Sequence, residues 1–206
     1  MKRIKDWTRL TRWPACLPVG ACALLLCLLA PACSGGQDDS GNDGPLACSL
    51  NTSFEAPAHA TGTVTFQTYS NPCGELNLNV TFTGISNIFT VGFDLTYPSG
   101  TFSFNGFTEG PLLKQGFPST PPFFSVTETS PGRIAVFASR FSPDGSVSVA
   151  GETFLLTLRF RALMIGQGTI AFDLSGTSPV QDQVLDQNGN LVPATFVNGS
   201  NVARVF

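Results

Sequence analysis

The feature that most constrains the fold of this chain is the alternation of apolar and polar side chains over several long stretches. Every second residue between positions 76 and 82 is apolar, and the same period of two recurs at residues 89–97 and 154–160. This period places successive side chains on opposite faces of a β-strand, so that each stretch has one buried and one solvated face. We find no convincing apolar stripe of helical spacing after residue 32. The pattern therefore predicts an all-β domain.

Seven shorter segments also have strand-like patterns, and turn-forming residues separate them. Asn71-Pro72 and Pro131-Gly132 are two such breakers. The shorter segments are residues 62–69, 101–107, 123–129, 133–139, 168–174, 181–185 and 201–206. We expect about nine short strands that form an antiparallel β-sandwich or a barrel, in which two facing sheets bury the phenylalanines.

The first 32 residues have the layout of a cleavable export signal. Five basic residues precede an apolar stretch that runs from residue 15 to residue 30. A transmembrane helix is the alternative, but it needs about 20 unbroken apolar residues, and proline and glycine interrupt this stretch at Pro18, Gly20 and Pro31. We therefore predict a signal peptide at residues 1–32 and an exported protein.

The residues around Cys33 resemble a bacterial lipoprotein signal. The segment Ala30-Pro31-Ala32-Cys33 is similar to sites where the peptidase cuts before a cysteine that carries a diacylglycerol. This resemblance implies lipidation of Cys33 and attachment to the cell envelope through the lipid. Residues 33–46 contain almost no large apolar side chain and are predicted to form a flexible polar tether. Ordinary secretion, with cleavage after Ala32, is the alternative.

The charge that remains after residue 32 argues against nucleic acid as a partner. Six Lys and Arg stand against 13 Asp and Glu, which gives a net charge of −7. Proteins bind nucleic acid mainly by neutralising phosphates with basic side chains. Residues 47–206 are long enough for one domain with a single core.

Two cysteines, Cys48 and Cys73, remain in the predicted domain once the signal and Cys33 are set aside. An even pair in an exported chain favours a disulfide. Closing a loop of this length would stabilise the fold by about 3.5 kcal/mol on the chain-entropy model. Two free thiols are the alternative.

Several segments together resemble a cohesin, the β-sandwich module with which scaffolding proteins of cellulose-degrading complexes hold dockerin-bearing partners. The four segments are VGFDLTYPSGTFSFNGFTEGPLL, SPGRIAVFAS, GETFLLTLRFRAL and VLDQNGNLVPATFVNGSNVARV, and their order and spacing agree with the family from about residue 85 to the end. The resemblance implies a nine-stranded jelly roll and non-catalytic binding of a dockerin-like protein module. Because the fold is similar to that of carbohydrate-binding modules, direct binding of polysaccharide is the alternative function.

The resemblance also implies a partner-binding face on two strands. The outward residues, by alternation, are Thr90, Gly92, Asp94 and Thr96 on the first strand and Thr157, Arg159 and Arg161 on the second. The family's strand order would make these strands neighbours, with Asp94 across from Arg159 or Arg161. Either the residues form a cross-strand ion pair worth a few tenths of a kcal/mol, or the arginines anchor a protein partner. Thr90 and Gly92 stand where well-studied cohesins carry Asn and Asp.

A second candidate binding surface is the phenylalanine-rich segment 101–124, which contains six phenylalanines among Gly and Pro. Some of them are candidates for an exposed apolar patch, although core packing and loop anchoring are the favoured alternative. They are Phe102, Phe104, Phe107, Phe117, Phe123 and Phe124.

The sequence contains no pattern typical of catalysis. Its one histidine, His59, lies in a stretch of small residues and is interpreted as a surface residue. We expect no enzyme activity, no cofactor and no metal. Calcium is an alternative at residues 186–190 and at Asp144, but Val197 occupies the position of the bidentate Glu of an EF-hand. Asn188-Gly189 instead favours a type I′ hairpin turn, and Asp144-Gly145 a simple turn.

Overall fold

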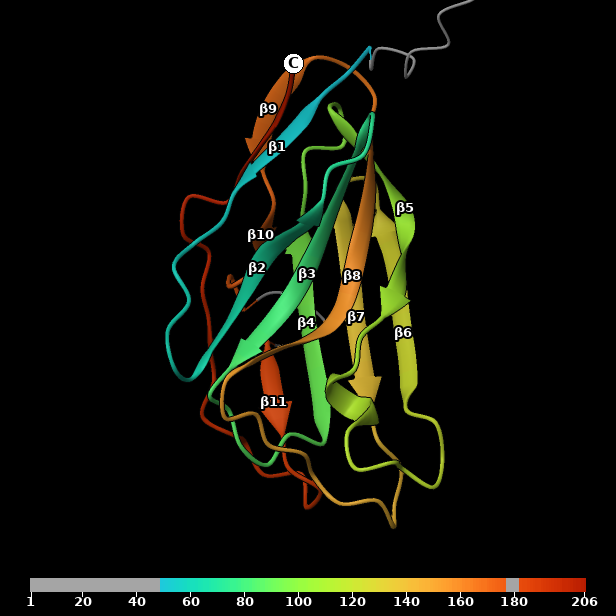
Figure 1. Cartoon of the computed structure of the whole chain (residues 1–206), viewed down its shortest axis with the longest axis vertical. Coiled ribbons are helices and arrows are strands. Elements are labelled where there is room, and N and C mark those ends of the chain that lie inside the picture. Colours follow the sequence, from blue (N-terminus) through green and yellow to red (C-terminus); the bar gives the residue numbers. More distant parts are fainter. Residues whose placement is uncertain (1–48, 177–181) are drawn as a thin grey trace, which may run out of the picture. The chain divides into compact units, whose positions relative to one another are not determined.

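The computed structural model describes residues 49–176 and 182–206, which belong to one compact unit, Gly44–Phe206. The predicted signal peptide, the tether, Cys33 and Cys48 lie outside the described residues. Two β-sheets pack face to face in this unit (Figure 1). The all-β sandwich predicted from the alternation is confirmed.

The first sheet, which we call the β3-β8 sheet, has its two longest strands at the centre. Its order is β12 (Thr195–Phe196), β2 (Thr63–Ser70), β3 (Glu75–Thr83), β8 (Glu152–Ala162) and β5 (Phe102–Glu109). All neighbours in it are antiparallel except β12 and β2, which are parallel. The chain leaves β5 through a 3-10 turn, η1 (Leu112–Lys114), on its way to the other sheet.

The second sheet, which we call the β4-β7 sheet, packs against the first. Its order is β10 (Ala171–Phe172), β4 (Thr90–Thr96), β7 (Arg133–Ser139) and β6 (Phe123–Ser130). A further strand, β11 (Gln183–Leu185), pairs with the same edge of β4 as β10 does. A small sheet of β1 (Thr52–Glu55), β13 (Val202–Val205) and β9 (Gly166–Thr169) completes the unit.

The core lies between the two large sheets and is filled by the apolar half of each alternating stretch. Val91, Phe93 and Leu95 of β4 are fully buried. The rings of Phe66 and Phe172 stack across the sandwich with their centroids 4.3 Å apart. Burying an aromatic side chain of this size stabilises the fold by roughly 1.5–3 kcal/mol, so the alternating phenylalanines determine how the sheets face each other.

The strand number differs from the prediction. The described residues form thirteen strands rather than about nine. The short β1 and β12 had no alternating pattern long enough to recognise. The stretch 168–174 divides between β9 and β10, which lie in different sheets because the chain turns at Ile170, a fully buried residue.

Candidate functional site

The two strands of the predicted partner-binding face lie in different sheets. β4 pairs with β7, β10 and β11, whereas β8 pairs with β3 and β5. The expectation that Asp94 lies across from Arg159 or Arg161 is therefore wrong. Alternation indicates which side of a strand faces the core, but it does not indicate which sheet a strand joins.

Asp94 points away from the core, as predicted, but it is only 1% exposed. The neighbouring strand is interrupted between β10 and β11, and at this gap the backbone of Asp94 is paired irregularly. Its carbonyl accepts from the Asp173 N–H at 2.8 Å, and its own N–H donates to Oδ1 of Asp182 at 3.3 Å. The Asp182 carboxylate thus takes the place of a strand carbonyl. Asp94 cannot contact a partner.

Burial makes this corner of the β4-β7 sheet sensitive to pH. The pKa of Asp182 is raised to about 6, mainly by burial and also by the Asp94 carboxylate, while the hydrogen bond from the Asp94 N–H opposes the shift. The pKa of Asp94 is also raised by burial, against the lowering effect of the Arg133 guanidinium. Arg133 itself forms an ion pair with Asp173.

The other residues of the predicted face are divided between the two outer surfaces. Thr90 is half-buried and its hydroxyl lies 2.7 Å from that of Ser139, while Thr96 is half-buried next to Arg133. On the opposite surface, Thr157 is buried and donates to Oδ1 of Asn79 at 2.6 Å. Arg159 and Arg161 are exposed. The residues of the predicted partner-binding face therefore do not form a single site.

Exposed aromatic side chains instead gather on the outer face of β6 and β7. Phe123 is 46% exposed and Phe137 is 40% exposed, and their ring centroids lie 6.2 Å apart. The register places Phe123 opposite Ser139 and Phe137 opposite Ser125, so the two rings are diagonal neighbours on one face. β6 is the edge strand of its sheet. We call Phe123 and Phe137 the phenylalanine surface.

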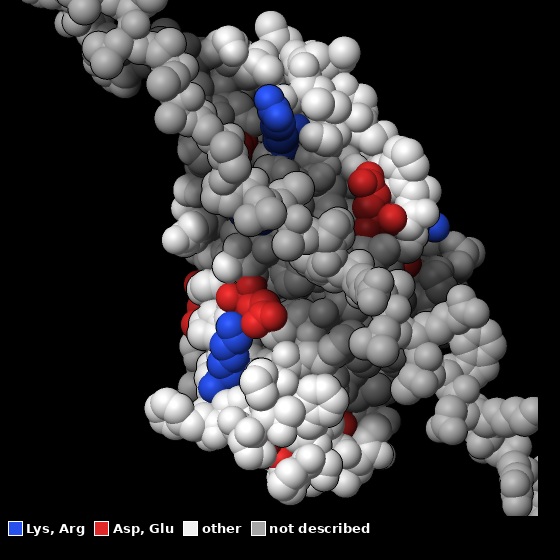
Figure 2. Space-filling view, turned by 90° about the vertical axis from the view of Figure 1, so that its right-hand side faces the viewer, with Lys and Arg blue, Asp and Glu red and all other residues white. Residues whose placement is uncertain are grey.

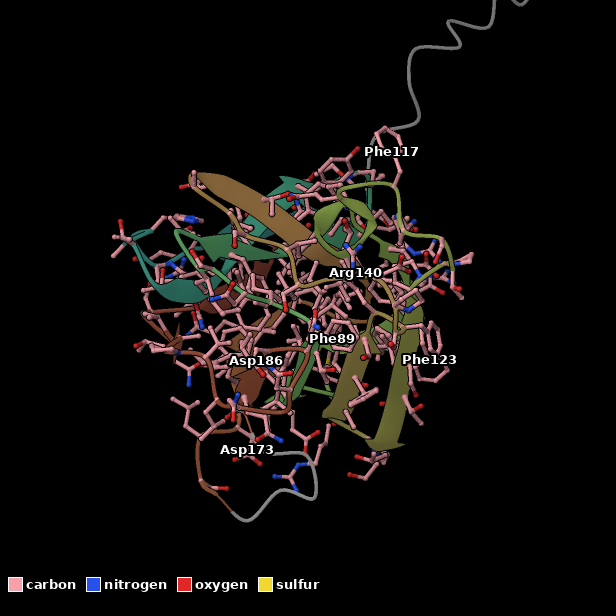
Figure 3. All side chains as sticks on the ribbon, turned by 90° about the horizontal axis from the view of Figure 1, so that it is seen from below. Phe89, Phe117, Phe123, Arg140, Asp173 and Asp186 are labelled. Atoms are coloured by element: carbon pink, nitrogen blue, oxygen red, sulfur yellow. The ribbon has the colours of Figure 1, made fainter. Side chains whose placement is uncertain are left out.

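Two connecting loops near the end of β7 carry further exposed rings. Phe117 is 98% exposed on the loop after η1, and Phe141 is 44% exposed just after β7. Figure 3 shows Phe117 and Phe123 pointing away from the sheets on different sides of the unit, so Phe117 is not part of the phenylalanine surface. An aromatic ring exposed this far on an ordered loop is typical of a contact residue.

One buried and one exposed set of polar contacts fix these loops to each other. The guanidinium of Arg140, which is buried, donates through Nη1 to the carbonyls of Leu113 at 3.1 Å and Gln115 at 2.7 Å. In the exposed set, Asp144 accepts hydrogen bonds from both the N–H and the hydroxyl of Ser119 at 2.9 Å. The phenylalanine surface lies on the paired strands β6 and β7 that these loops adjoin, and such prior order lowers the entropy lost on binding.

Few charges surround this surface. The outer side of β6 carries Phe123, Ser125 and Thr127, and the outer side of β7 carries Arg133, Ala135 and Phe137. Figure 2 faces the neighbouring edge of the unit, where β5 and β6 lie, and shows a few basic and acidic side chains there. Depletion of charge together with exposed aromatic rings is typical of the centre of a protein–protein interface.

The phenylalanine-rich segment was interpreted correctly for the most part, and one important residue was missed. Phe102 is buried, and Phe104, Phe107 and Phe124 pack against the core. Phe137 was not recognised, although alternation within 133–139 was sufficient to find it, since Ile134, Val136 and Ala138 take the inward positions.

His59 is less exposed than the sequence suggested, because its side chain is only 18% exposed. Its Nδ1 lies 3.2 Å from the hydroxyl of Thr65 and 3.6 Å from a carboxylate oxygen of Glu152. A hydroxyl nucleophile and its orienting carboxylate need the two different ring nitrogens of a histidine. Both groups here approach the same nitrogen and Thr65 is fully buried, so this arrangement is not a catalytic triad.

The carboxylates of the two acidic turns accept hydrogen bonds from the chain itself, Asp186 within its own loop and Asp144 from a neighbouring loop. Asp186 accepts hydrogen bonds from Asn188 and Asn190, which lower the pKa of its carboxyl group. Gly189 has a φ of +81°, but Asn188 has no positive φ, so the turn is not type I′ as predicted. Asp144 closes onto Ser119 and Thr120. Within residues 49–176 and 182–206, no three His, Cys, Asp or Glu side chains are grouped so that they could hold a metal ion.

Two further predictions concern the cysteines and the membrane. Cys73 is disulfide-bonded, but Cys48 lies outside the described residues, so the pairing of the two stays a prediction. In the described part of the chain, none of the helical structure has the length and apolar content needed to cross a membrane.

No protein-family model matches the chain, and no curated protein matches it. Among solved structures, it is similar to the cohesin CaCohA2 from Clostridium acetobutylicum, with 18% identity, a TM-score of 0.48, and 72% of this chain and 87% of that one covered. It is also similar to a non-cellulosomal cohesin from the archaeon Archaeoglobus fulgidus, with 16% identity, a TM-score of 0.46, and coverage of 72% and 87%. A chain of a type I cohesin–dockerin complex from Clostridium thermocellum has 15% identity, a TM-score of 0.48, and coverage of 73% and 95%. These are cohesin structures, the family that the sequence motifs resemble, and the likeness concerns the β-sandwich fold.

Proposed function

We propose that this chain is a non-catalytic binding protein of the cell envelope, and that its β-sandwich docks a dockerin-like protein module on the phenylalanine surface. One observation carries the proposal: Phe123 and Phe137 are in contact and exposed on a preorganised and nearly uncharged sheet face. Burying such rings supplies binding energy at the centre of an interface, where charged groups would have to be desolvated.

The class of partner follows from the resemblance of the sequence to cohesins together with the shape of this face. An outer sheet face without a deep pocket fits the apolar side of a helix better than a small molecule. The partner would carry duplicated calcium loops of the pattern Asp-x-Asn-x-Asp-Gly, and its helices would place apolar side chains on the phenylalanine surface. The biological setting would be polysaccharide use or surface assembly.

The cellular location is proposed from the sequence alone. Residues 1–32 would direct export, Cys33 would carry the lipid, and residues 33–46 would hold the sandwich away from the membrane. Because each buried methylene contributes about 0.8 kcal/mol, two or three acyl chains would suffice for stable attachment. Mass spectrometry of the mature amino terminus tests this: an acylated Cys33 is expected, and an unmodified residue at any other position would contradict the anchor.

The binding test uses a dockerin-like module from the same genome and isothermal titration calorimetry with the purified full chain. Replacing both exposed rings, Phe123→Ser with Phe137→Ser, is expected to weaken binding about 100-fold, or ~2.7 kcal/mol. Both side chains are partly solvated already, so the melting curve should change little. Chelating the calcium of the partner should abolish binding.

A matched control lies on the opposite sheet. Tyr69→Ala also removes an exposed ring, since Tyr69 is 65% exposed on β2, and it should leave partner binding unchanged. Equal loss of affinity in both variants, or full affinity in the double phenylalanine variant, would remove the phenylalanine surface from the interface.

A further inference from the structure

The outer surface of the β3-β8 sheet contains a groove that the proposed docking of a protein does not use. It has a volume of about 300 Å³ and lies over β2, β3, β8 and β5. This volume is at the lower end of the range for ligand sites. Its lining residues are Tyr69, Asn77, Thr108, Glu109, Phe154, Thr157 and Arg159.

Three β-bulges surround this groove, one in each of three strands. Tyr69 is the extra residue of β2 opposite β3, and Leu155 is the extra residue of β8 opposite β3. In β5, the pair Asn105 and Gly106 stands opposite the single residue Arg159. Bulges redirect side chains and bend strands next to binding sites. Here the bulges expose the Tyr69 ring and present Phe154, next to Leu155, on the outer face.

An unsatisfied polar group lies at the floor of the groove. Asn77 is 7% exposed, and its Nδ2 donates to the Ser70 hydroxyl at 3.1 Å. Its Oδ1 is buried and accepts no hydrogen bond. Such an orphaned acceptor is unfavourable and rare in native proteins. A ligand hydroxyl that displaces the exposed side chains around Asn77 would satisfy it.

Two charged side chains border the groove with complementary hydrogen-bonding capacity. Arg159 is exposed, and its guanidinium passes over Gly106, where an added Cβ would lie only 3.3 Å from Nη2. Glu109 uses Oε2 to bind Lys114 at 2.9 Å, which leaves Oε1 as an acceptor. A guanidinium fork donates and a carboxylate accepts, so together they match neighbouring hydroxyls on a ring.

The same chemistry recurs two residues further along β8. A second hollow of about 330 Å³ includes Glu75, Asn105 and Arg161 among its lining residues, again a carboxylate, an amide and a guanidinium. Arg161 stands opposite Glu75 in the register, next to the pair of Arg159 and Asn77. A repeat of donor and acceptor groups along a strand suits a chain of repeating units rather than a single small molecule.

From these observations we propose that the outer face of the β3-β8 sheet binds a neutral polysaccharide chain. Tyr69 and Phe154 form an apolar wall for the C–H face of one pyranose ring, and Asn77, Glu109 and Arg159 contact its hydroxyl rim. Along this face Glu75 and Glu109 offset two of the three cations Lys114, Arg159 and Arg161, and the mixture of donors and acceptors suits the hydroxyls of an uncharged sugar. This site is separate from the phenylalanine surface, so the chain holds a protein on one sheet and a glycan on the other.

The test is titration of the full chain with cellohexaose, xylohexaose and mannohexaose, followed by NMR chemical shifts and calorimetry. At least one of the three is expected to bind with a Kd below about 1 mM and to shift the amide signals of residues around Tyr69 and Arg159. Tyr69→Ala should weaken binding at least about tenfold, whereas Tyr69→Phe, which keeps the ring, should retain it.

Phe137→Ser is the matched control, since it removes an exposed ring from the other sheet, and it should leave sugar binding unchanged. The proposal would be overturned if none of the three hexasaccharides bound, if Tyr69→Ala bound as tightly as the original chain, or if a charged galacturonate oligomer bound in preference to all of them. None of these results depends on whether a dockerin-like partner binds.

Discussion

The outer faces of the two sheets differ in how they are built. The β4-β7 sheet presents the phenylalanine surface on a stretch of β6 and β7 whose register is unbroken from Phe123 to Glu128, next to loops that Arg140 and Asp144 hold. The β3-β8 sheet presents polar side chains, and bulges in three of its strands hollow it. A flat apolar face suits another protein, and a polar groove suits a hydroxylated ligand. One core thus supports two surfaces of different chemistry.

The largest effect is expected from Arg140→Ala, which tests whether buried contacts hold the apolar face. The substitution removes a charged donor and leaves the carbonyls of Leu113 and Gln115 without it. Because hydrogen bonds to charged groups contribute about 1.5–3 kcal/mol each, the free energy of unfolding in urea should fall by about 3 kcal/mol. Lys114→Ala, in the same loop, breaks only the exposed ion pair with Glu109 and should change stability by less than about 1 kcal/mol.

A smaller effect is expected from pH at the gap beside β4. The pKa of Asp182 is about 6 in the folded chain, above the unfolded value of about 3.9. The folded state therefore binds more protons between these values, and stability should fall on the order of 1–3 kcal/mol as the pH rises from about 4 to 7. Asp182→Asn removes the titrating carboxyl group while its amide oxygen still accepts from Asp94, so the variant should keep only the part of this fall that the raised pKa of Asp94 causes.

Asp186 supplies the control for this pH effect, because its shift has the opposite sign. Hydrogen bonds from Asn190 and Asn188 lower the pKa of Asp186, so its contribution to stability is present above its unfolded pKa and is lost as the pH falls. Asp186→Asn should leave the loss between pH 4 and 7 intact. Urea titrations across this range that show no loss for the original chain would contradict the burial of Asp182.

Gly106→Ala tests the role of the groove on the β3-β8 sheet. Gly106 has a φ of +92°, which side chains other than glycine rarely adopt, so the variant should lose about 1–2 kcal/mol of stability. The new Cβ would also displace the guanidinium of Arg159 and weaken hexasaccharide binding, while partner binding stays intact. At Gly100 an added Cβ meets no atom within 4 Å, and Gly100→Ala should alter neither activity.

The smallest effect is expected from metal removal. Within the described ranges, 49–176 and 182–206, acidic side chains form no three-membered group suited to a metal. Asp186 accepts hydrogen bonds from its own loop, and Asp144 accepts them from the loop at Ser119. A thermal melt with and without EDTA should therefore give the same Tm. A lower Tm in EDTA would show a metal site in the chain itself, in contrast to the calcium expected in the partner.

Alternation in the sequence was sufficient to predict most strands. It did not predict burial or bulges that depend on contacts with segments distant in the sequence. The inward residues of β3 and β4, and of β8 from Leu156 onward, follow their pattern directly, whereas Phe154, predicted to face inward, lies on the outer face because of the bulge at Leu155. The burial of Asp94 depends on Asp173 and Asp182, which are remote in sequence. β-Bulges at Tyr69 and Leu155 have no local signature, because an extra residue becomes visible only against its partner strand. The groove was for that reason absent from the sequence interpretation.

The assignment of a protein partner to the β4-β7 sheet is tested most directly by amide NMR chemical-shift mapping of the full chain with its dockerin-like partner bound. We predict shifts at Phe123, Phe137 and their neighbours, with the signals around Tyr69 and Arg159 left in place. Shifts concentrated around Tyr69 and Arg159, with Phe123 and Phe137 unchanged, would contradict this account.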